Sequence, residues 1–435
     1  MLKAIKSVVP MPMKQALYPI KDKTYDQWQK KRLFKRMQVK HAELIEQIKG
    51  KQKIKVVFLA MHESVWKVDP VFKKMLADSF FEPEILVCPY TVYGEERMLK
   101  DMEQAYNYFS NKNYPVQKSI KDDGSWITLD ELKPDIVFFT NPHNLTRKEY
   151  YEDAYLNYLS CYCGYGMPIS KYGNYQEQYN QKFHNSVWNI FVQTQEMINN
   201  YIEVSVRQTK GVYLVGDNTV ELLEAKSSAN GLAWHDKKSR LKVIYAPHHS
   251  INSNEPLSIG SFLKNGEFLK LIATQYSENI YWSFKPHPLL KSRLYLHKDW
   301  GKDKTDQYYK FWELSDFSQL DNGEYIDLFL NSDAMILDSS SFLGEYLFTK
   351  KPLLYLMKEK TWDYMSNFGK NCLDASYQAN NQGDISRFIQ SILSQEDPMI
   401  DKRLALINDY KSNLKSEETT SQLIINHLKS NIRNH

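Results

Sequence analysis

The sequence has few cysteines and no long apolar segment. Its 435 residues include four cysteines, and the one close pair, Cys161 and Cys163, has a C-x-C spacing rather than the C-x-x-C of zinc or redox motifs. These features argue against a disulfide framework and a zinc site, and they favour a reducing cytoplasm. No segment approaches the roughly 18 uncharged apolar residues that a membrane-spanning helix needs.

Two nucleotide-binding motifs are also missing. There is no Gly-x-x-x-x-Gly-Lys-Ser/Thr, which argues against a P-loop ATPase, and no Gly-x-Gly-x-x-Gly follows a predicted strand, which argues against a conventional dinucleotide oxidoreductase. Asp333 and Asp338 are not spaced like a metal-binding Asp-x-Asp. We therefore expect no cofactor and no obligatory metal. The net charge of +4 gives no reason to expect a nucleic-acid partner.

What is present begins with a basic amphipathic segment over residues 1–52. Basic residues greatly outnumber acidic ones there. Apolar and aromatic side chains recur at helical spacings between the basic clusters, namely at Trp28, Leu33, Phe34, Met37, His41, Leu44, Ile45 and Ile48. Such a helix could lie on an anionic membrane surface through residues 1–50, which would make the protein peripheral at the inner face of the cell membrane. Alternatively, it could pack on the protein with its basic face in solvent.

The rest of the chain alternates predicted strands with predicted helices, which indicates an α/β protein with two Rossmann-like domains. We place the first domain at 53–205, the second at 206–400 and a C-terminal helix at 401–435. Strands are predicted at 53–60, 84–89, 136–140, 158–163, 189–194, 211–216, 241–246, 280–284, 334–337 and 353–356. Helices are predicted at 71–78, 95–110, 125–132, 261–277, 325–330 and 342–348.

Three strands of the second predicted domain end in polar residues. These ends carry His248, His249 and Ser250; Lys285 and His287; and Asp338, Ser339, Ser340 and Ser341. Ligands of open parallel sheets bind beyond the carboxyl ends of the strands, so we expect the three ends to converge. Imidazoles, an ammonium group, hydroxyls and a helix N-terminus together suit a diphosphate.

Single residues at these ends have alternative interpretations. His287 is held stiffly between two prolines. It is either a general acid or a hydrogen-bond donor to phosphate, or it is an ordinary turn histidine. Asp338 or Ser339 could simply cap the following helix. Glu345, one helical turn after Ser341, could accept hydrogen bonds from ribose hydroxyls, or it is a solvated helix glutamate.

The order of four motifs resembles the CDP-glycerol glycerophosphotransferase family of teichoic acid and capsule synthesis. The motifs are Tyr-Ala-Pro at 245–247, Lys-Pro-His-Pro at 285–288, Ser-Asp-x4-Asp-Ser-Ser-Ser-x3-Glu-Tyr at 332–346 and Lys-Pro-x2-Tyr at 351–355. The resemblance covers about 185–360. It implies a GT-B arrangement, in which two Rossmann-like domains face each other across a cleft. The second domain would then bind a nucleotide-activated donor and the first an acceptor.

The resemblance also implies roles and a reaction. His287 would contact the donor diphosphate and assist departure of the leaving group, Ser339, Ser340 and Ser341 would hold the phosphates, and Glu345 would hold the ribose. The expected enzyme moves glycerol phosphate or a related polyol phosphate from a CDP-activated donor to a saccharide or lipid-linked acceptor. One alternative is a GT-B glycosyltransferase with a nucleotide-sugar donor. Another is a non-catalytic nucleotide-sugar-binding scaffold at the membrane.

The sequence departs from this family in the first domain. Polymerising members carry a Trp-His-Gly-Thr-Pro segment whose histidine is taken as the base, whereas here Tyr165 occupies that position. A neutral tyrosine, with an ordinary pKa of about 10, is a poor base at neutral pH. Other candidates near the ends of predicted strands are Asp69, His62, Glu63 and His143. We favour Asp69 and then His62 as the base, and place His143 and Tyr165 among the substrate-binding residues.

Overall fold

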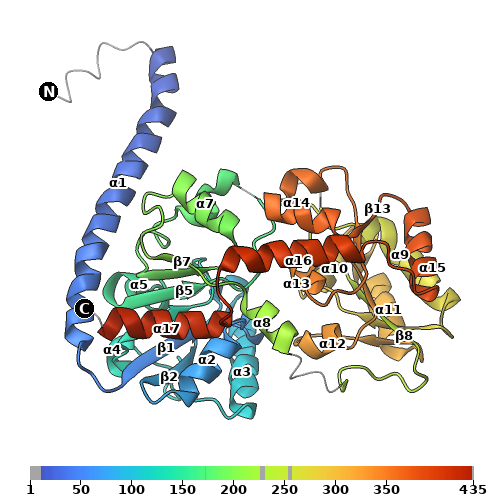
Figure 1. Cartoon of the computed structure of the whole chain (residues 1–435), viewed down its shortest axis with the longest axis horizontal. Coiled ribbons are helices and arrows are strands. Elements are labelled where there is room, and N and C mark those ends of the chain that lie inside the picture. The colour runs from blue at the N-terminus through green and yellow to red at the C-terminus, as the bar shows by residue number, and fades with distance from the viewer. Residues whose placement is uncertain (1–10, 172, 226–230, 253–256, 434–435) are drawn as a thin grey trace.

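Two parallel sheets, each covered by helices, make up the body of the protein (Figure 1). The computed structural model describes residues 11–171, 173–225, 231–252 and 257–433. The strand order is β3-β2-β1-β4-β5-β6-β7 in the first sheet and β10-β9-β8-β11-β12-β13 in the second. This arrangement confirms the prediction of two Rossmann-like domains.

The first sheet and its helices lie between residues 54 and 214. Its strands are β1 Ile54–Ala60, β2 Phe81–Val87, β3 Val116–Lys118, β4 Ile136–Phe139, β5 Leu159–Cys163, β6 Asn189–Val192 and β7 Val212–Leu214. Its helices are α2 Asp69–Ala77, α3 Glu95–Asn111, α4 Leu129–Leu132, α5 Glu152–Asn157, α6 Gln176–Tyr179 and α7 Gln195–Val204. The central strands β1 and β4 are apolar except at Lys55, as expected for a sheet whose two faces are both covered by helices.

The second sheet follows a short connecting helix, α8 Asn218–Ala225. Its strands are β8 Leu241–Ala246, β9 Ile280–Phe284, β10 Ser318–Leu320, β11 Ala334–Leu337, β12 Leu353–Leu356 and β13 Tyr377–Ala379. Its helices are α9 Phe262–Gln275, α10 Leu290–Tyr295, α11 Gly301–Leu314, α12 Ile326–Leu330, α13 Ser340–Leu347, α14 Asn367–Asp374 and α15 Gln382–Leu393. The strand predicted at 334–337, the helix at 342–348 and the strand at 353–356 are therefore present as β11, α13 and β12.

Two predicted boundaries are wrong. Strand β7 pairs in parallel with β6, so the first sheet extends to Leu214 and the second domain does not begin at residue 206. A short apolar run in the sequence does not show which sheet it will join. The run predicted at 211–216 forms β7, the edge strand of the first sheet. The helix predicted over 125–132 is confined to α4, because Thr128 caps it in a reciprocal hydrogen-bonded box with Glu131.

Helix α1 (Met11–Ile48) runs along the first domain and projects well beyond it (Figure 1). Its apolar stripe is buried from Phe34 through Met37 and His41 to Ile48. The alternative that the helix packs on the protein is therefore confirmed for residues 34–48. Trp28 lies outside the packed stripe and remains 53% exposed. The first ten residues of the predicted basic segment lie outside the described residues.

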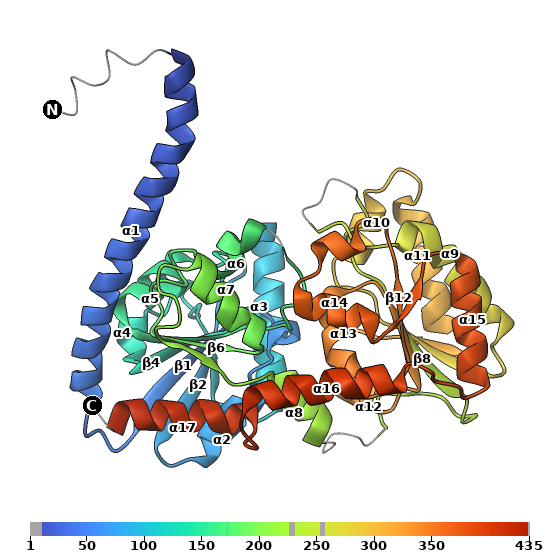
Figure 2. The ribbon, with the colours of Figure 1, turned by 45° about the horizontal axis from the view of Figure 1, so that its top comes forward.

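The single helix predicted over 401–435 is divided into two, α16 Ile400–Leu414 and α17 Thr420–Arg433. The break falls at Lys415, whose φ of 52° ends α16 in a left-handed conformation. Helix α16 packs on the second domain, while Ile424 and Leu428 of α17 join the core of the first domain (Figure 2). The tail therefore joins both domains, and the whole has the GT-B arrangement.

Candidate functional site

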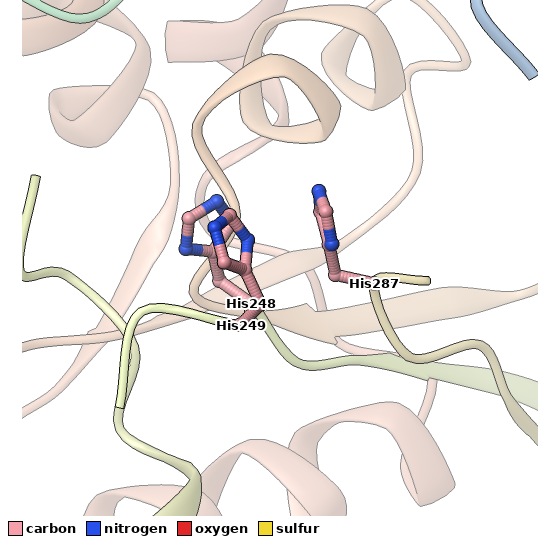
Figure 3. Close-up of side chains that lie close together, drawn as sticks. All are labelled: His248, His249 and His287. Atoms are coloured by element: carbon pink, nitrogen blue, oxygen red, sulfur yellow. The ribbon is translucent and has the colours of Figure 1, made fainter. Parts of the chain in front are cut away.

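Three histidines gather where the central strands of the second sheet end (Figure 3). His248 and His249 follow β8, and His287 follows the neighbouring strand β9. The ring centroid of His249 lies 4.2 Å from that of His248 and 4.0 Å from that of His287, and the third pair is 5.2 Å apart. The predicted convergence of these two strand ends is confirmed, because β8 and β9 are adjacent in the sheet.

The backbone fixes the proton position in two of these rings. The N–H of Leu289 donates to Nδ1 of His287 at 3.1 Å, and the N–H of Ser250 donates to Nδ1 of His248 at 3.2 Å. A backbone N–H can only donate, so each Nδ1 is unprotonated and each neutral ring carries its proton on Nε2. Burial lowers the pKa of His287 to about 3, helped by nearby His249. At neutral pH, His287 is therefore an uncharged N–H donor.

The cluster is better suited to an anion than to a cation. Its ligand atoms lie within 4.8 Å of one another, and three histidines are a familiar donor set for a metal. A metal needs a nitrogen lone pair, however, and in His248 and His287 the lone pair at Nδ1 already accepts a backbone hydrogen bond. The Nε2–H groups of His248 and His287 are hydrogen-bond donors, and such donors suit the oxygens of a phosphate. The expected absence of an obligatory metal stays a prediction.

Asp338 ties the strand ends together from inside. Its buried carboxylate accepts hydrogen bonds from the backbone N–H of His248 and from both the N–H and the hydroxyl of Ser261, at the start of α9. The hydroxyl of Ser250 is similarly occupied by backbone donors and is buried. The predictions that Asp338 caps α13 and that Asp338 and Ser250 contact substrate are therefore corrected to framework roles.

The third strand end forms the N-terminus of α13. Ser339 is the N-cap residue in extended conformation but makes no side-chain capping bond, and Ser340 and Ser341 open the helix half-buried. The first-turn N–H groups of such a helix favour an anion. A methyl group added at Gly166 of the first domain would lie 3.6 Å from Cβ of Ser341, so α13 begins at the boundary between the domains. The phosphate roles of these serines stay predictions.

Two further predicted residues of the second domain are buried. Nζ of Lys285 donates to the carbonyl of Gly323 at 2.9 Å, and burial lowers the pKa of this lysine to about 8. Glu345 accepts a hydrogen bond from the hydroxyl of Tyr325 and is 1% exposed. The alternative of a solvated Glu345 is therefore wrong, whereas its ribose role stays a prediction.

Asp69, the favoured base, belongs to the framework of the first domain. Its carboxylate accepts from Nε1 of Trp66 at 3.0 Å and from the hydroxyl of Tyr114 at 2.9 Å, and it pairs with Lys73 at 2.9 Å. Burial tends to raise the pKa of Asp69, but nearby Lys112 and the bonds from Lys73 and Tyr114 hold it below its usual value. A saturated carboxylate with a lowered pKa is a poor base, so this preference is corrected.

Three other candidates follow strands of the first sheet. His62 follows β1 and packs on the ring of Tyr90 at 4.9 Å, and burial lowers its pKa. His143 follows β4, and burial lowers its pKa as well. Tyr165 follows β5, is 36% exposed and has a pKa raised by burial, which disfavours it further as a base. His62 and His143 remain candidates for the base that accepts the proton of the acceptor hydroxyl.

One cross-domain contact has no sequence signal. Nζ of Lys67, in the loop after β1, donates to the hydroxyl of Tyr325 at 2.6 Å. Lys67 lies between Trp66 and Asp69 in a loop without a motif, and Tyr325 is one aromatic residue at the start of a predicted helix. Only the packing of the two domains brings these side chains together.

Comparisons with known proteins agree with this architecture. A family model described as CDP-Glycerol:Poly(glycerophosphate) glycerophosphotransferase matches residues 168–409, which is more than half of the chain and includes every strand end discussed above in the second domain. The comparison with curated proteins gave no match.

Several solved structures share the fold at low sequence identity. A complex of Staphylococcus aureus MnaA with UDP is 12% identical, has a TM-score of 0.54 and aligns over 88% of this chain and 98% of its own. A variant of the wall teichoic acid polymerase TagF is 13% identical, with a TM-score of 0.55 and coverage of 88% and 89%. At this identity, the likeness shows the fold alone.

Proposed function

The chain belongs to the CDP-glycerol:poly(glycerophosphate) glycerophosphotransferase family, and from this premise we propose that it moves glycerol phosphate or a related polyol phosphate from a CDP-activated donor to a saccharide or lipid-linked acceptor. It is a transferase of cell-wall polymer synthesis. The observation that carries the proposal is the histidine cluster at the ends of β8 and β9 together with the start of α13, which follows the neighbouring strand β11, because this combination suits a diphosphate.

The reaction is a direct displacement at phosphorus. The acceptor oxygen forms a bond to the phosphorus that carries the glycerol, the bond from that phosphorus to the bridging oxygen breaks, and CMP leaves with the electron pair. The Nε2–H of His287 would donate to the departing phosphate as its charge develops. The negative charge of the bound donor would also raise the pKa of His287. The hydroxyl proton goes to a base of the first domain, for which His62 and His143 are the candidates.

Calorimetry with a panel of donors tests this proposal. CDP-glycerol, CDP-ribitol, a UDP-sugar and a GDP-sugar are titrated into the wild type and into His287→Ala. We expect the CDP-activated polyols to bind best and the variant to weaken them by about tenfold or more. His297→Ala is the matched control, because His297 also accepts a backbone N–H at Nδ1 but lies on the surface outside the site. Absence of nucleotide binding by the wild type would contradict the proposal.

The glycosyltransferase alternative rests on Tyr165, which replaces the histidine of polymerising members. Turnover decides among the three possibilities. Release of CMP from CDP-glycerol in the presence of a lipid-linked acceptor supports polyol phosphate transfer, whereas release of UDP or GDP from a nucleotide sugar supports glycosyl transfer. Binding of a donor without turnover of any kind would indicate the scaffold.

We also propose that the projecting part of α1 contacts an anionic membrane surface. Tyr25 and Trp28 are 58% and 53% exposed, their ring centroids lie 6.0 Å apart, and the guanidinium of Arg32 lies 5.6 Å from the Trp28 ring centroid. Exposed aromatic rings among basic residues are typical of membrane interfaces. Within the part of the chain that the structure describes, no helix meets the length and apolarity needed to cross a membrane.

Vesicle co-sedimentation tests the membrane contact. We expect the wild type to bind vesicles that contain phosphatidylglycerol and not vesicles of phosphatidylcholine alone, and the double variant Tyr25→Ser, Trp28→Ser to lose this binding. Leu314→Ser is the control, because Leu314 is an even more exposed apolar residue but lies on α11 of the second domain. Unchanged binding of the double variant would contradict the contact.

A further inference from the structure

A chain of contacts joins the first domain to α13 of the second. Nζ of Lys67 lies 2.6 Å from the hydroxyl of Tyr325 and 4.0 Å from the centroid of its ring. The same hydroxyl donates to Oε2 of Glu345. Tyr325 and Glu345 are both buried, so the chain runs through the interior of the molecule. Lys67 of the first domain is thus linked to the Glu345 carboxylate of the second domain through the hydroxyl of Tyr325.

The loop that carries Tyr325 is held from both domains. Its neighbour Glu324 pairs with Lys112 of α3 at 2.6 Å and accepts from the hydroxyl of Tyr108. From the second domain, Lys285 donates to the carbonyl of Gly323 in the same loop. This loop follows β10, at the carboxyl edge of the sheet that also carries the histidine cluster. Contacts from both domains therefore fix the position of Tyr325.

The charges around Glu345 explain why a lysine is needed there. Burial raises the pKa of Glu345 to about 7, although the Lys67 ammonium opposes this rise, and the carboxylate of Asp217 adds to it. Lys67 itself faces Glu345, Asp217 and Glu324. Lys67 is the cation that acts on Glu345 from the first domain, and without it the buried carboxyl would be largely protonated near neutral pH. A protonated carboxyl is a weaker acceptor than a carboxylate.

We propose that Lys67 is a positioning residue of the donor site, which acts through Tyr325 to fix the Glu345 carboxylate for the ribose of the nucleotide. Tyr325 occupies Oε2, and Oε1 is the atom that would accept from the ribose hydroxyls. The inference rests on the proposed function, in which the second domain binds a CDP-activated donor. It gives the first domain a part in recognising the donor as well as the acceptor.

Discrimination between CDP and 2′-deoxy-CDP tests this role. Both nucleotides are titrated by calorimetry at pH 6 and pH 8 into the wild type, Lys67→Met, Lys67→Arg and the control Lys118→Met. Lys118 is a matched control, because it pairs with Glu103 at 2.8 Å within the first domain. We expect the wild type to prefer CDP by about tenfold or more, since a site built for a hydroxyl rejects the analogue without it.

The wild-type preference should be strongest at pH 8, above the pKa of Glu345 of about 7, and weaker at pH 6. Lys67→Met should lose most of the preference at pH 8, because without the lysine the buried carboxyl stays largely protonated there. Lys67→Arg should retain the preference, and Lys118→Met should match the wild type. If Lys67→Met fails to fold, Tyr325→Phe breaks the same link without removing a charge and should also lose the preference.

Three results would overturn the inference, and they are distinguishable. If Lys67→Met and Tyr325→Phe keep the wild-type preference for CDP at both pH values, Lys67 has no positioning role, while the proposed function stands on the binding of CDP. If the wild type binds neither nucleotide, the proposed function fails and takes the inference with it. Equal binding of the two nucleotides by the wild type removes the ribose contact of Glu345, and with it the role of Lys67.

Discussion

The backbone N–H groups that reach the imidazoles decide what these rings can do. Because Leu289 donates to Nδ1 of His287, the ring presents Nε2–H to the site and stays neutral. Under the proposed function, His287 would donate a hydrogen bond to a charged phosphate oxygen, and it would transfer a proton only once the charge of the bound nucleotide has raised its pKa.

Two substitutions of His287 should separate the effect of its hydrogen-bond donor from the effect of its side-chain volume. His287→Ala removes the donor and is expected to lower kcat/KM by about 10²-fold or more, in the range found for loss of one oxyanion donor. His287→Gln keeps a side-chain N–H and should lose less. Initial rates of CMP release from CDP-glycerol measure both variants. Equal losses for Ala and Gln would show that an N–H donor is not what the site requires.

Asp338 should matter for stability. Asp338→Ala leaves the N–H of His248 and the N–H and hydroxyl of Ser261 buried without their acceptor, which we expect to cost about 2–4 kcal/mol. Urea unfolding with matched slopes measures the loss. Asp374→Ala, at an exposed position, should change the midpoint little. A midpoint for Asp338→Ala within that control's range would contradict the framework role.

Sequence motifs located the residues of the site but not the direction in which each side chain faces. His248, His287 and Glu345 were found because of their place after predicted strands and within the family motifs. The framework roles of Asp338 and Asp69 were missed, because their partners are set by tertiary packing; Ser261 lies 77 residues from Asp338 in sequence. Lys67 was missed for the same reason.

At the scale of elements, the site depends on strand order. Strands β9, β8 and β11 are neighbours, so the residues that follow them meet. The apolar runs predicted most of the long strands, and the turn residues after them predicted where the polar ends fall. The three-residue strands β10 and β13 were missed, because runs this short carry no clear periodicity.

A short segment of the first domain is built into the second. Ser170 forms an antiparallel bridge with Met365, and the carbonyl of Ile169 accepts from the N–H of Ser366 at 2.9 Å. Gly369, in the first turns of α14, lies directly against this carbonyl: an added Cβ would be 2.2 Å from the oxygen. The close approach requires glycine at this position.

Gly369→Ala should therefore displace the segment or unfold α14 locally. The clash is with backbone, which cannot rotate away, and we expect a loss of about 1–3 kcal/mol despite the better helix propensity of alanine. Gly383→Ala is the control, because its added methyl group meets only the side chains of Asn381 and Arg387. Thermal melting of both variants checks the difference. Equal melting temperatures would refute the close contact.

At the scale of the whole molecule, several separate links hold the two domains. The tail crosses from α16 on the second domain to α17 on the first (Figure 2). The segment around Ile169 and the Lys67–Tyr325 contact add further links between the domains. The family resemblance predicted two domains facing across a cleft, but only packing shows which loops meet there.

Buried histidines should make the protein sensitive to mild acid. Burial lowers the pKa of His41 and His184 to about 3. Below pH 6.5 these two histidines therefore bind protons in the unfolded chain but not in the folded chain. Stability should be full above pH 6.5 and fall toward pH 4 by about 1.4 kcal/mol per pH unit for each such histidine. His184→Gln should flatten the dependence of the urea midpoint on pH by one histidine's share. An unchanged slope would contradict this assignment.

A crystal structure with CDP-glycerol bound tests the central claim most directly. The account predicts the diphosphate at the start of α13, with a phosphate oxygen within hydrogen-bonding distance of Nε2 of His287 and the ribose near Glu345. A donor bound with its phosphates away from the histidine cluster, for example against the first domain, would contradict it.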